Sequence, residues 1–423
     1  MENWRLEILE NLVDIDSEQL GNTTDKDYLF YYIDIGSVSS GMILFPSFPT
    51  AFNEAPSRAR KILQNGDILM SSVRPNLKAF ARFNSEDTNS QFVASTGFAV
   101  LRVKKGTDID YIYHSLFSSP IENQITSLVV GSNYPALNTR DIRKLKIYLP
   151  QSKIEQTKIA SILNLADEGI AQTKKLVDKY HRIKLGLQQD LLTKGIDVKG
   201  NIRSKTTHKF VIKKGIEVPV EWNVNTVEDV LDDIEQGWSP DCEGEEAPTN
   251  EWGVLKTTSV TWEGFNEKEN KRLPQKLMPK VKYEIKSNDV LITRAGPNSR
   301  VGVIAHVKTT RSKLILSDKL YRLIPNNKIV PEFLALALSN PYTQRHLSNL
   351  KTGMAESQTN ISQAIIKALI ISLPNVDEQN MIIQHLNGIE AVLTDYKFHL
   401  KKLYAIKTGL MQDLLSGKVK VKK

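Results

Sequence analysis

The sequence predicts an α+β protein in which two similar mixed α/β domains are joined by two long helices. Three observations lead to this fold class. The chain repeats itself with a period near 223 residues, each mixed segment ends at a Leu-Pro pair, and a long helical pattern follows each pair. We expect a first domain over 1–149, a first helical region over 150–200, a second domain over 201–373 and a second helical region over 374–423.

The repeat is visible in short motifs that return at a nearly constant offset. Asp67, in an Asp-Ile-Leu run, returns as Asp289 in an Asp-Val-Leu run, an offset of 222 (289 minus 67). Leu149-Pro150 returns as Leu373-Pro374, an offset of 224 (373 minus 149). So small a drift indicates loop insertions between two copies of one unit, which makes the chain an internal duplication.

Strand-like runs precede each Leu-Pro pair. Residues 98–103 (Phe-Ala-Val-Leu-Arg-Val) and 322–324 (Arg-Leu-Ile) are examples. Each half also opens on a tryptophan followed by alternating apolar residues, at Trp4 and at Trp222. The order of elements is therefore the same in both halves.

Apolar residues recur at steps of three and four after each Leu-Pro pair, which is the heptad seam of a helix that seeks a partner helix. The first seam comprises Leu163, Ala166, Ile170, Thr173, Val177, Tyr180, Lys184, Leu187 and Leu191. Adding 223 to each number gives the second seam: Leu386, Ile389, Leu393, Tyr396, Leu400, Leu403, Lys407, Leu410 and Leu414. Both seams break at an equivalent lysine, which can snorkel or fix the register of a pair.

The matching register favours a helix pair over two unrelated amphipathic surface helices that each pack on their own domain. An antiparallel pair would relate the two domains by a pseudo-two-fold axis. The sequence pattern alone leaves a parallel pair open.

Composition points to a polyanionic partner and away from membranes. The formal net charge is +8 and the pI is about 9.1, a balance that favours nucleic acid because cations displace counterions from phosphates. The chain has a single cysteine, Cys242, and no apolar run near the roughly 18 residues of a membrane span. With no signal-peptide pattern at the start, we expect a cytoplasmic protein.

A Pro-Asn turn occurs at equivalent places in the two halves, over 71–78 and over 293–300. Small hydroxyls and cations around such a turn suit contacts to phosphates or guanine edges, although a solvated hairpin fits the pattern equally well. The candidate DNA contacts here are Ser72, Arg74, Asn76 and Lys78 in the first half, and Thr293, Arg294, Asn298, Ser299 and Arg300 in the second.

A second loop precedes each Leu-Pro pair, over 131–138 and 353–360. Its amides and hydroxyls can pair with base edges, and the candidates are Ser132, Asn133, Tyr134, Ser357 and Gln358. Asn138 and Asn360 align with each other, and for these two we expect caps of the helices that follow.

Catalytic and metal-binding patterns are missing from the sequence. Ser339-Asn340-Pro341-Tyr342 lacks the second proline of an adenine-methylase motif, and no Gly-x-x-x-x-Gly-Lys-Ser/Thr loop is present. The histidines form no metal-ligand cluster, and the acidic stretch over 241–246 suits a solvated loop better than a cation site. Trp238, Trp252 and Trp262 can stack on bases, but core or loop-anchoring roles are favoured.

These segments together resemble the specificity subunit of type I restriction-modification systems, over nearly the whole chain. The most specific part is the strand and Leu-Pro break over 145–150, which runs into Glu155-Gln156 and the helix. Gln-Asp-Leu-Leu at the end of each half is also typical. The second copy departs from the pattern, because its helix starts Met381-Ile382-Ile383 without the usual Lys-Ile-Ala run.

The resemblance implies two target-recognition domains that each read one part of an interrupted sequence in double-stranded DNA. It also implies that the helical regions form an antiparallel coiled-coil spacer and dock two modification subunits, with Glu155, Gln156, Glu378 and Gln379 as docking residues. Restriction subunits complete the complex. S-adenosylmethionine, ATP and Mg are expected on these partners, with no cofactor, metal or catalytic residue on this chain.

Three other readings stay open. The chain could itself modify or cut DNA, which the missing motifs disfavour. It could be a coiled-coil adaptor whose end domains bind proteins, which salt-dependent DNA affinity would exclude. It could also be the specificity partner of a fused nuclease-methylase, which copurifying subunits would reveal.

Overall fold

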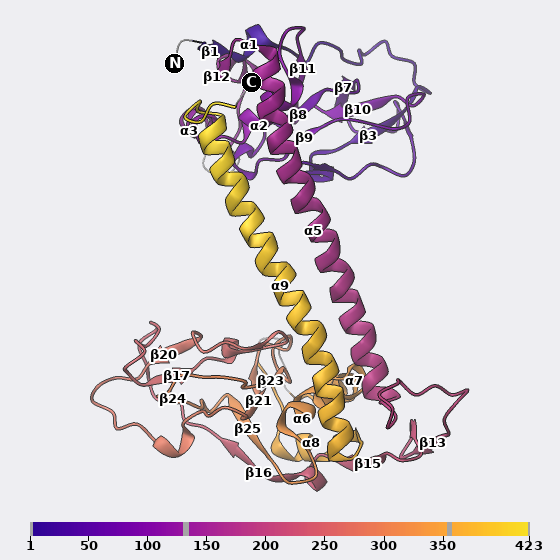
Figure 1. Ribbon diagram of the computed structural model, residues 1–423, viewed down its shortest axis with the longest axis vertical. Coiled ribbons are helices and arrows are strands. Elements are labelled where there is room, and N and C mark those ends of the chain that lie inside the picture. The colour runs from indigo at the N-terminus through magenta and orange to yellow at the C-terminus, as the bar shows by residue number, and fades with distance from the viewer. Residues whose placement is uncertain (1–2, 130–134, 353–357, 422–423) are drawn as a thin grey trace. The chain divides into compact units, whose positions relative to one another are not determined.

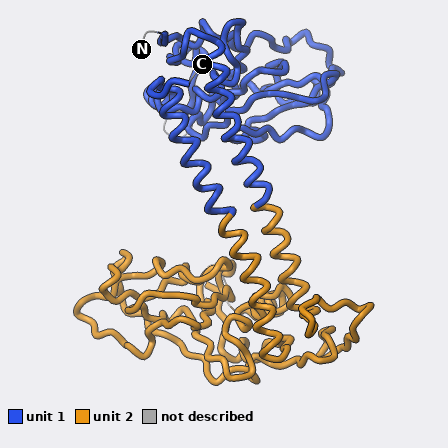
Figure 2. Tube along the Cα trace, in the orientation of Figure 1, with its two compact units in different colours: residues 1–176, 396–423 blue, residues 177–395 orange. Residues whose placement is uncertain are grey.

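The computed structural model describes residues 3–129, 135–352 and 358–421 as a mixed α/β protein (Figure 1). Two long helices follow the Leu-Pro pairs, α5 (Lys153–Thr193) and α9 (Val376–Leu414). The chain divides into two compact units (Figure 2): unit 1 holds residues 1–176 and 396–423, and unit 2 holds residues 177–395. Each unit therefore includes one part of α5 and one part of α9.

Besides the short hairpin pair β4 (Val38–Ser39) and β5 (Met42–Ile43), the described residues of unit 1 form three sheets. The pair β1 (Trp4–Ile8) and β12 (Lys146–Pro150) is antiparallel. The second sheet has the order β2 (Val13–Ile15), β11 (Phe98–Val103), β8 (Ile68–Ser71) and β9 (Phe80–Arg82), all antiparallel. The third has the order β6 (Thr50–Ala51), β3 (Leu29–Ile33), β10 (Phe92–Ser95) and β7 (Ala59–Leu63), in which β3 and β10 are parallel. Its shorter helices are α1 (Leu9–Leu12), α2 (Ile109–Leu116), α3 (Ser119–Leu128) and α4 (Thr139–Arg143).

Unit 2 contains sheets of corresponding order. The pair β15 (Asn223–Thr226) and β27 (Ile370–Leu373) is antiparallel. The second sheet has the order β16 (Leu231–Gln236), β25 (Leu320–Pro325), β21 (Val290–Thr293) and β23 (Ile304–His306). The third has the order β20 (Asn270–Arg272), β17 (Gly253–Leu255) and β24 (Leu314–Ile315), in which β17 and β24 are parallel. Its shorter helices are α6 (Pro331–Leu338), α7 (Pro341–Leu350) and α8 (Gln363–Ala368), and β13 (Phe210–Lys213) pairs with β14 (Ile216–Pro219).

The repeated Asp-Ile/Val-Leu motif has a structural reason. Asp67 is 1% exposed and accepts two hydrogen bonds of 2.9 Å from the Arg102 guanidinium, on the neighbouring strand β11. In unit 2 the Asp289 carboxylate lies 3.1 Å from the guanidinium of Arg322, on β25. In each unit the aspartate directly before β8 or β21 thus pairs with an arginine of the neighbouring strand, as a carboxylate removed from solvent requires. This shared pair explains why the motif occurs in both halves.

The predicted heptad seams match the burial of both helices. All nine seam positions of α5 and all nine of α9 are buried or half-buried. In unit 1, Leu163 near the beginning of α5 shares one core with Leu414 at the end of α9. In unit 2, Leu191 near the end of α5 shares one core with Leu386 near the beginning of α9.

The two lysines that interrupt the seams form ion pairs between the helices. Lys407 of α9 pairs with Asp167 of α5 in unit 1, and Lys184 of α5 pairs with Glu390 of α9 in unit 2. The two pairs are equivalent, because adding 223 to 184 and 167 gives 407 and 390. Each lysine neutralises a carboxylate beside the apolar seam, which supports the prediction that it fixes register.

A buried histidine lies where α2 of unit 1 packs on α5. His114 Nε2 is 2.8 Å from Asn164 Oδ1, and its Nδ1 is 3.8 Å from Asp167 Oδ2. Burial lowers the pKa of His114 to about 4, and nearby Lys407 and Arg82 act in the same direction. The imidazole is therefore neutral at physiological pH.

Among the described residues, no helix is long and apolar enough to cross a membrane.

Candidate nucleic-acid interface

The two loops predicted from the sequence lie side by side in unit 1. Val73 forms an antiparallel bridge with Ala136. On either side of it, the Arg74 amide donates to the Pro135 carbonyl at 2.7 Å, and the Leu137 amide donates to the Ser72 carbonyl at 2.8 Å. Residues 72–78 and 135–138 therefore form one continuous surface.

Unit 2 pairs its two loops in the same way. Strand β22 (Ala295–Gly296) is antiparallel to β26 (Thr359–Asn360). The Ile361 amide donates to the Arg294 carbonyl at 2.9 Å. We call the two regions, 72–78 with 135–138 and 293–300 with 358–361, the paired-loop surfaces.

The Pro-Asn turn of unit 1 is a short 3-10 turn, η2 (Pro75–Leu77), between two cations in left-handed backbone conformation. Arg74 has a φ of 48° and Lys78 a φ of 49°. Both values lie in the left-handed region, which residues other than glycine rarely adopt. The side chains of Arg74 and Asn76 are exposed, whereas Lys78 is half-buried with its Nζ 2.9 Å from Glu122 Oε2. Strain of this kind persists where the surroundings enforce it, often at binding sites.

In unit 2 the exposed members of the predicted set are Asn298, Ser299 and Gln358. Lys351 donates from Nζ to the Asn298 carbonyl at 3.0 Å, and its partial burial lowers the pKa of its ammonium group. These groups offer one cation together with amide and hydroxyl donors and acceptors, which suits phosphates and base edges.

Four predicted contact residues form hydrogen bonds within their own unit, and for the three half-buried ones the DNA contact stays a prediction. Thr293 is fully buried and its hydroxyl accepts from the Val303 amide at 2.9 Å, so it is out of reach of DNA. Half-buried Ser72 donates from its hydroxyl to the Gly97 carbonyl at 2.8 Å. The other two are the half-buried Arg294 and Arg300, whose guanidinium groups donate to backbone carbonyls within unit 2, at 3.1 Å for Arg294 and at 2.9 and 3.0 Å for Arg300.

The remaining loop predictions have mixed outcomes. Ser132, Asn133, Tyr134 and Ser357 lie outside the described residues. Asn138 caps α4 as expected, since its Oδ1 accepts from the Asp141 amide at 2.8 Å. The cap expected at Asn360 is wrong: Asn360 belongs to β26, and Ser362 caps α8 because two more residues precede that helix.

The Glu-Gln pairs, predicted to dock other subunits, anchor the long helices to their own units. Gln156 is 2% exposed and accepts from the Asp108 amide at 2.9 Å, while Gln379 is fully buried and accepts from the Val330 amide at 2.8 Å. Glu378 is 5% exposed and accepts from Ile196, Arg203 and Trp222. A docking subunit cannot reach these three side chains, so the docking role predicted for them is corrected to a structural one.

The half-buried Glu155 accepts from Trp4 Nε1 at 3.3 Å. Its docking role stays a prediction.

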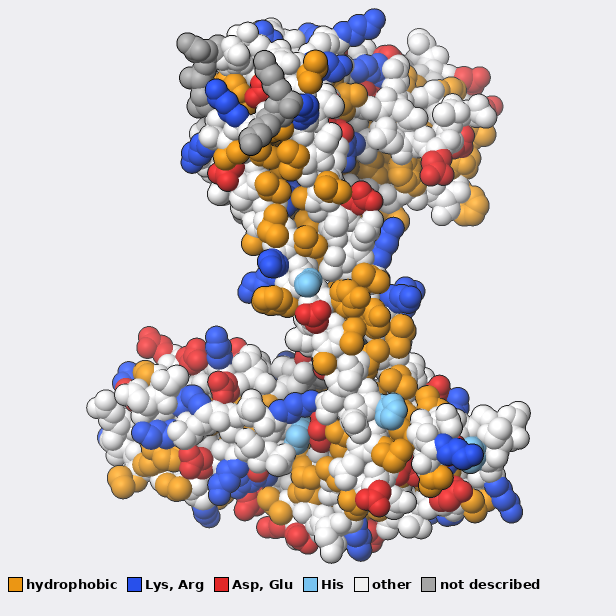
Figure 3. All heavy atoms as spheres, viewed as in Figure 1, with side chains coloured by type: hydrophobic (Ala, Val, Ile, Leu, Met, Phe, Trp, Pro, Cys, Tyr) orange, Lys and Arg blue, Asp and Glu red, His pale blue; other side chains and the backbone are white. Residues whose placement is uncertain are grey.

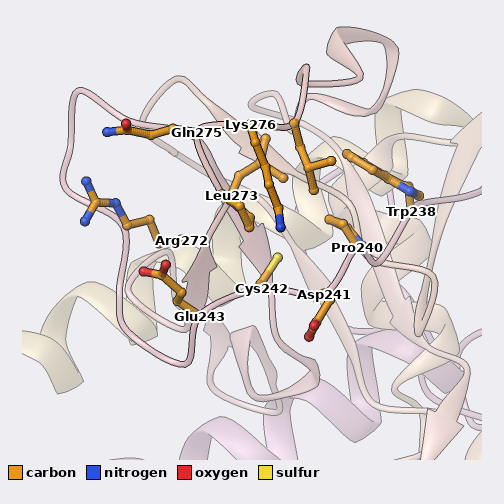
Figure 4. Close-up of a pocket in the computed structure, with 11 residues that line it drawn as sticks. Trp238, Pro240, Asp241, Cys242, Glu243, Arg272, Leu273, Gln275 and Lys276 are labelled. Atoms are coloured by element: carbon orange, nitrogen blue, oxygen red, sulfur yellow. The ribbon is translucent and has the colours of Figure 1, made fainter.

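An open hollow of about 800 Å³ in unit 2 carries the acidic stretch singled out in the sequence (Figure 4). Asp241 and Glu243 line it on different sides of Cys242, so their carboxylates do not converge on one point. Arg272, also in the lining, donates to the Glu251 carboxylate at 2.6 and 2.7 Å. Among the described residues, no group of three histidine, cysteine or acidic side chains is placed to hold a metal ion.

Charge of both signs is distributed over the surface. On the face that Figure 3 shows, lysines and arginines are interspersed with aspartates and glutamates on each unit. On this face, a contact with a polyanion therefore depends on local groups of cations.

Comparison with known proteins places the chain in a family. The description "type I restriction modification DNA specificity domain" matches residues 19–179 and again residues 219–402. The specificity subunit of the type I restriction enzyme EcoEI from Escherichia coli is 38% identical over 191 residues, which cover 45% of this chain and 32% of that protein. The MjaVIII specificity subunit from Methanocaldococcus jannaschii is 26% identical over 341 residues, 78% of this chain and 75% of that one.

A solved structure shares the fold. A chain from a study of complex assembly and conformational transition in a type I R-M system aligns over 98% of both chains, with a TM-score of 0.61 and 22% identity. The two family matches fall on the two halves of the predicted repeat and together cover most of the sequence. This chain therefore belongs to the family of proteins built from the type I restriction modification DNA specificity domain.

Proposed function

We propose that this chain is the DNA-recognition subunit of a type I restriction-modification complex, with no catalysis of its own. One observation carries the proposal: each unit builds a paired-loop surface from the same two segments of its repeat. Two equivalent surfaces with different exposed residues suit an interrupted DNA target whose two parts differ in sequence.

The two long helices are, in this proposal, an antiparallel coiled-coil spacer between two target-recognition domains related by duplication. The equivalent ion pairs Lys407–Asp167 and Lys184–Glu390 support this, as does the shared core of Leu163 and Leu414. An antiparallel pair places equivalent residues at equivalent positions, as a pseudo-two-fold axis requires.

The partners are two modification subunits, restriction subunits and double-stranded DNA. S-adenosylmethionine, ATP and Mg belong to those partners, and the complex acts in the cytoplasm. The docking surface on this chain lies outside the buried Gln156, Glu378 and Gln379.

The test is adenine methylation across a genome, read by single-molecule sequencing in cells that carry a matching methyltransferase subunit, with and without this chain. Methylation of an interrupted two-part motif only when the chain is present is the expected result. An active methyltransferase whose pattern is unchanged by the chain would overturn the proposal, and protein-binding end domains would then be the better explanation.

A further inference from the structure

An exposed tryptophan stands at the tip of a β-hairpin in unit 2. Strands β18 (Val260–Thr261) and β19 (Gly264–Phe265) are antiparallel, and Trp262 and Glu263 form the tip between them. The Trp262 side chain is 54% exposed, whereas the other four tryptophans of the chain are buried or half-buried. The exposed indole offers a large, rigid apolar surface, and its place beside the paired-loop surface is what points to a contact with a partner.

The hairpin is fastened to the paired-loop surface of unit 2. Arg300, which ends the Pro-Asn segment, donates from one guanidinium nitrogen to the Thr257 carbonyl at 2.9 Å and to the Val260 carbonyl at 3.0 Å. Asn298 and Ser299, both exposed, directly precede Arg300. These two bonds hold the hairpin against the Pro-Asn turn of unit 2.

Unit 1 has the corresponding hairpin in the corresponding place. Strands β4 (Val38–Ser39) and β5 (Met42–Ile43) are antiparallel, and Met42 is 61% exposed. The tip is joined to the end of the Pro-Asn turn, because the Gly41 amide donates to the Phe80 carbonyl at 2.8 Å and the Phe80 amide donates to the Lys78 carbonyl at 2.7 Å. Leu77, on the turn itself, is 65% exposed.

The chemistry of these tips fits the floor of the major groove better than a phosphate backbone. The major groove admits a two-stranded β-ribbon and displays thymine methyl groups and cytosine amino groups. Trp262 suits an apolar contact with a methyl group. Glu263, which phosphates would repel, can accept a hydrogen bond from a cytosine amino group.

We propose that the two hairpins read base edges in the major groove, with Trp262 and Glu263 as specificity-determining residues of unit 2 and Met42 as one of unit 1. The inference rests on the proposed function and deepens it. Because the tips differ, Ser-Gly-Met in one unit and Trp-Glu-Gly in the other, the two units select different bases.

The experiment compares wild type with Trp262→Ala, Glu263→Gln and Met42→Ala, each as the full chain with its methyltransferase subunits. Methylation rate and motif are read by single-molecule sequencing. Trp262→Ala should slow methylation of the wild-type motif at least 10-fold, and Glu263→Gln should relax selection at one position of the same half-site. Met42→Ala should alter the other half-site alone.

Met278→Ala is the matched control, since Met278 is 85% exposed in unit 2 but lies in the loop between β20 and β21. Trp262→Phe, which keeps an apolar ring, should recover most of the rate and so separates contact from misfolding. Wild-type rate and motif in both Trp262→Ala and Glu263→Gln would overturn the inference while leaving the proposed function intact. Failure of the wild type to impose any motif would instead overturn the proposed function.

Discussion

At the residue scale, a buried carboxylate in unit 2 and a buried imidazole in unit 1 are the groups whose alteration should most reduce the free energy of unfolding. Glu378 is the clearest case, because its carboxylate is enclosed by the Arg203 guanidinium, the Trp222 indole and the Ile196 amide. Removal of one partner from such a pair leaves the other charge buried without compensation.

Glu378→Gln should therefore lower the free energy of unfolding of unit 2 by about 3 kcal/mol, measured by urea denaturation. Glu217→Gln is the control, because Glu217 pairs with Lys205 in a pair whose side chains are 49% and 68% exposed. That change should shift the midpoint little. Equal effects of the two substitutions would contradict the anchoring role of Glu378.

His114 makes the stability of unit 1 depend on pH. Its pKa is about 4 in the folded protein and about 6.5 in an unfolded chain, so between these values the unfolded state binds the proton first. Stability should fall as pH drops from about 6.5 to 4, by roughly 3 kcal/mol in total.

His114→Gln should flatten this pH dependence, which thermal unfolding between pH 4 and 7 would measure. His399→Gln, at an exposed position in the same unit, is the control. An unchanged slope in His114→Gln would contradict the assignment of the acid sensitivity to His114.

At the element scale, the helices were predictable from the sequence and the interface was not. The seams over 163–191 and 386–414 follow from a local periodicity, and so do the strands that precede each Leu-Pro pair. The contact between 72–78 and 135–138 depends on backbone hydrogen bonds between segments about 60 residues apart, which no local pattern reports.

Polar side chains were the hardest to assign. A repeated Glu-Gln pair such as 378–379 looks the same in the sequence whether its side chains face a partner protein or the interior. Its burial therefore could not be predicted.

A core or anchoring role is the sequence-based expectation for Trp262, but its side chain is exposed because it lies at a hairpin tip. A Trp-Glu-Gly turn between short strand-like runs was the available signal.

The ion pairs between the helices can be tested directly. A double-mutant cycle of Lys407→Ala and Asp167→Ala should give a coupling energy of about 1 kcal/mol, because both side chains are less than a third exposed. Asp190 in α5 and Lys194, which directly follows the helix, are each 43% exposed; they form the control pair and should couple less. Equal coupling energies in the two pairs would contradict the role of Lys407 in fixing the register of the helices.

At the scale of the whole molecule, a net charge of +8 is modest, so DNA affinity must come from a few well-placed cations. Arg74→Gln should remove one phosphate contact and lower the slope of log affinity against log salt by about 1, because the Arg74 side chain is exposed on the paired-loop surface of unit 1.

Lys205→Gln is the control for this measurement, since Lys205 is exposed in unit 2 and is not part of the segments 293–300 and 358–361 that form its paired-loop surface. Fluorescence anisotropy with a labelled duplex at several salt concentrations gives the slopes. Affinity for DNA that is independent of salt in the wild type would contradict the proposed function as a whole.

The division of unit 1 between the first 176 and the last 28 residues has a consequence for synthesis on the ribosome. Leu414 and Leu415 complete a core that already contains Leu9, from the start of the chain. Unit 2 is continuous in sequence and can fold before residues 396–423 are synthesised. Unit 1 lacks its last helical segment until then. A nascent chain thus carries an open apolar surface for most of its elongation, and a premature stop before residue 396 would release a product that chaperones and proteases recognise.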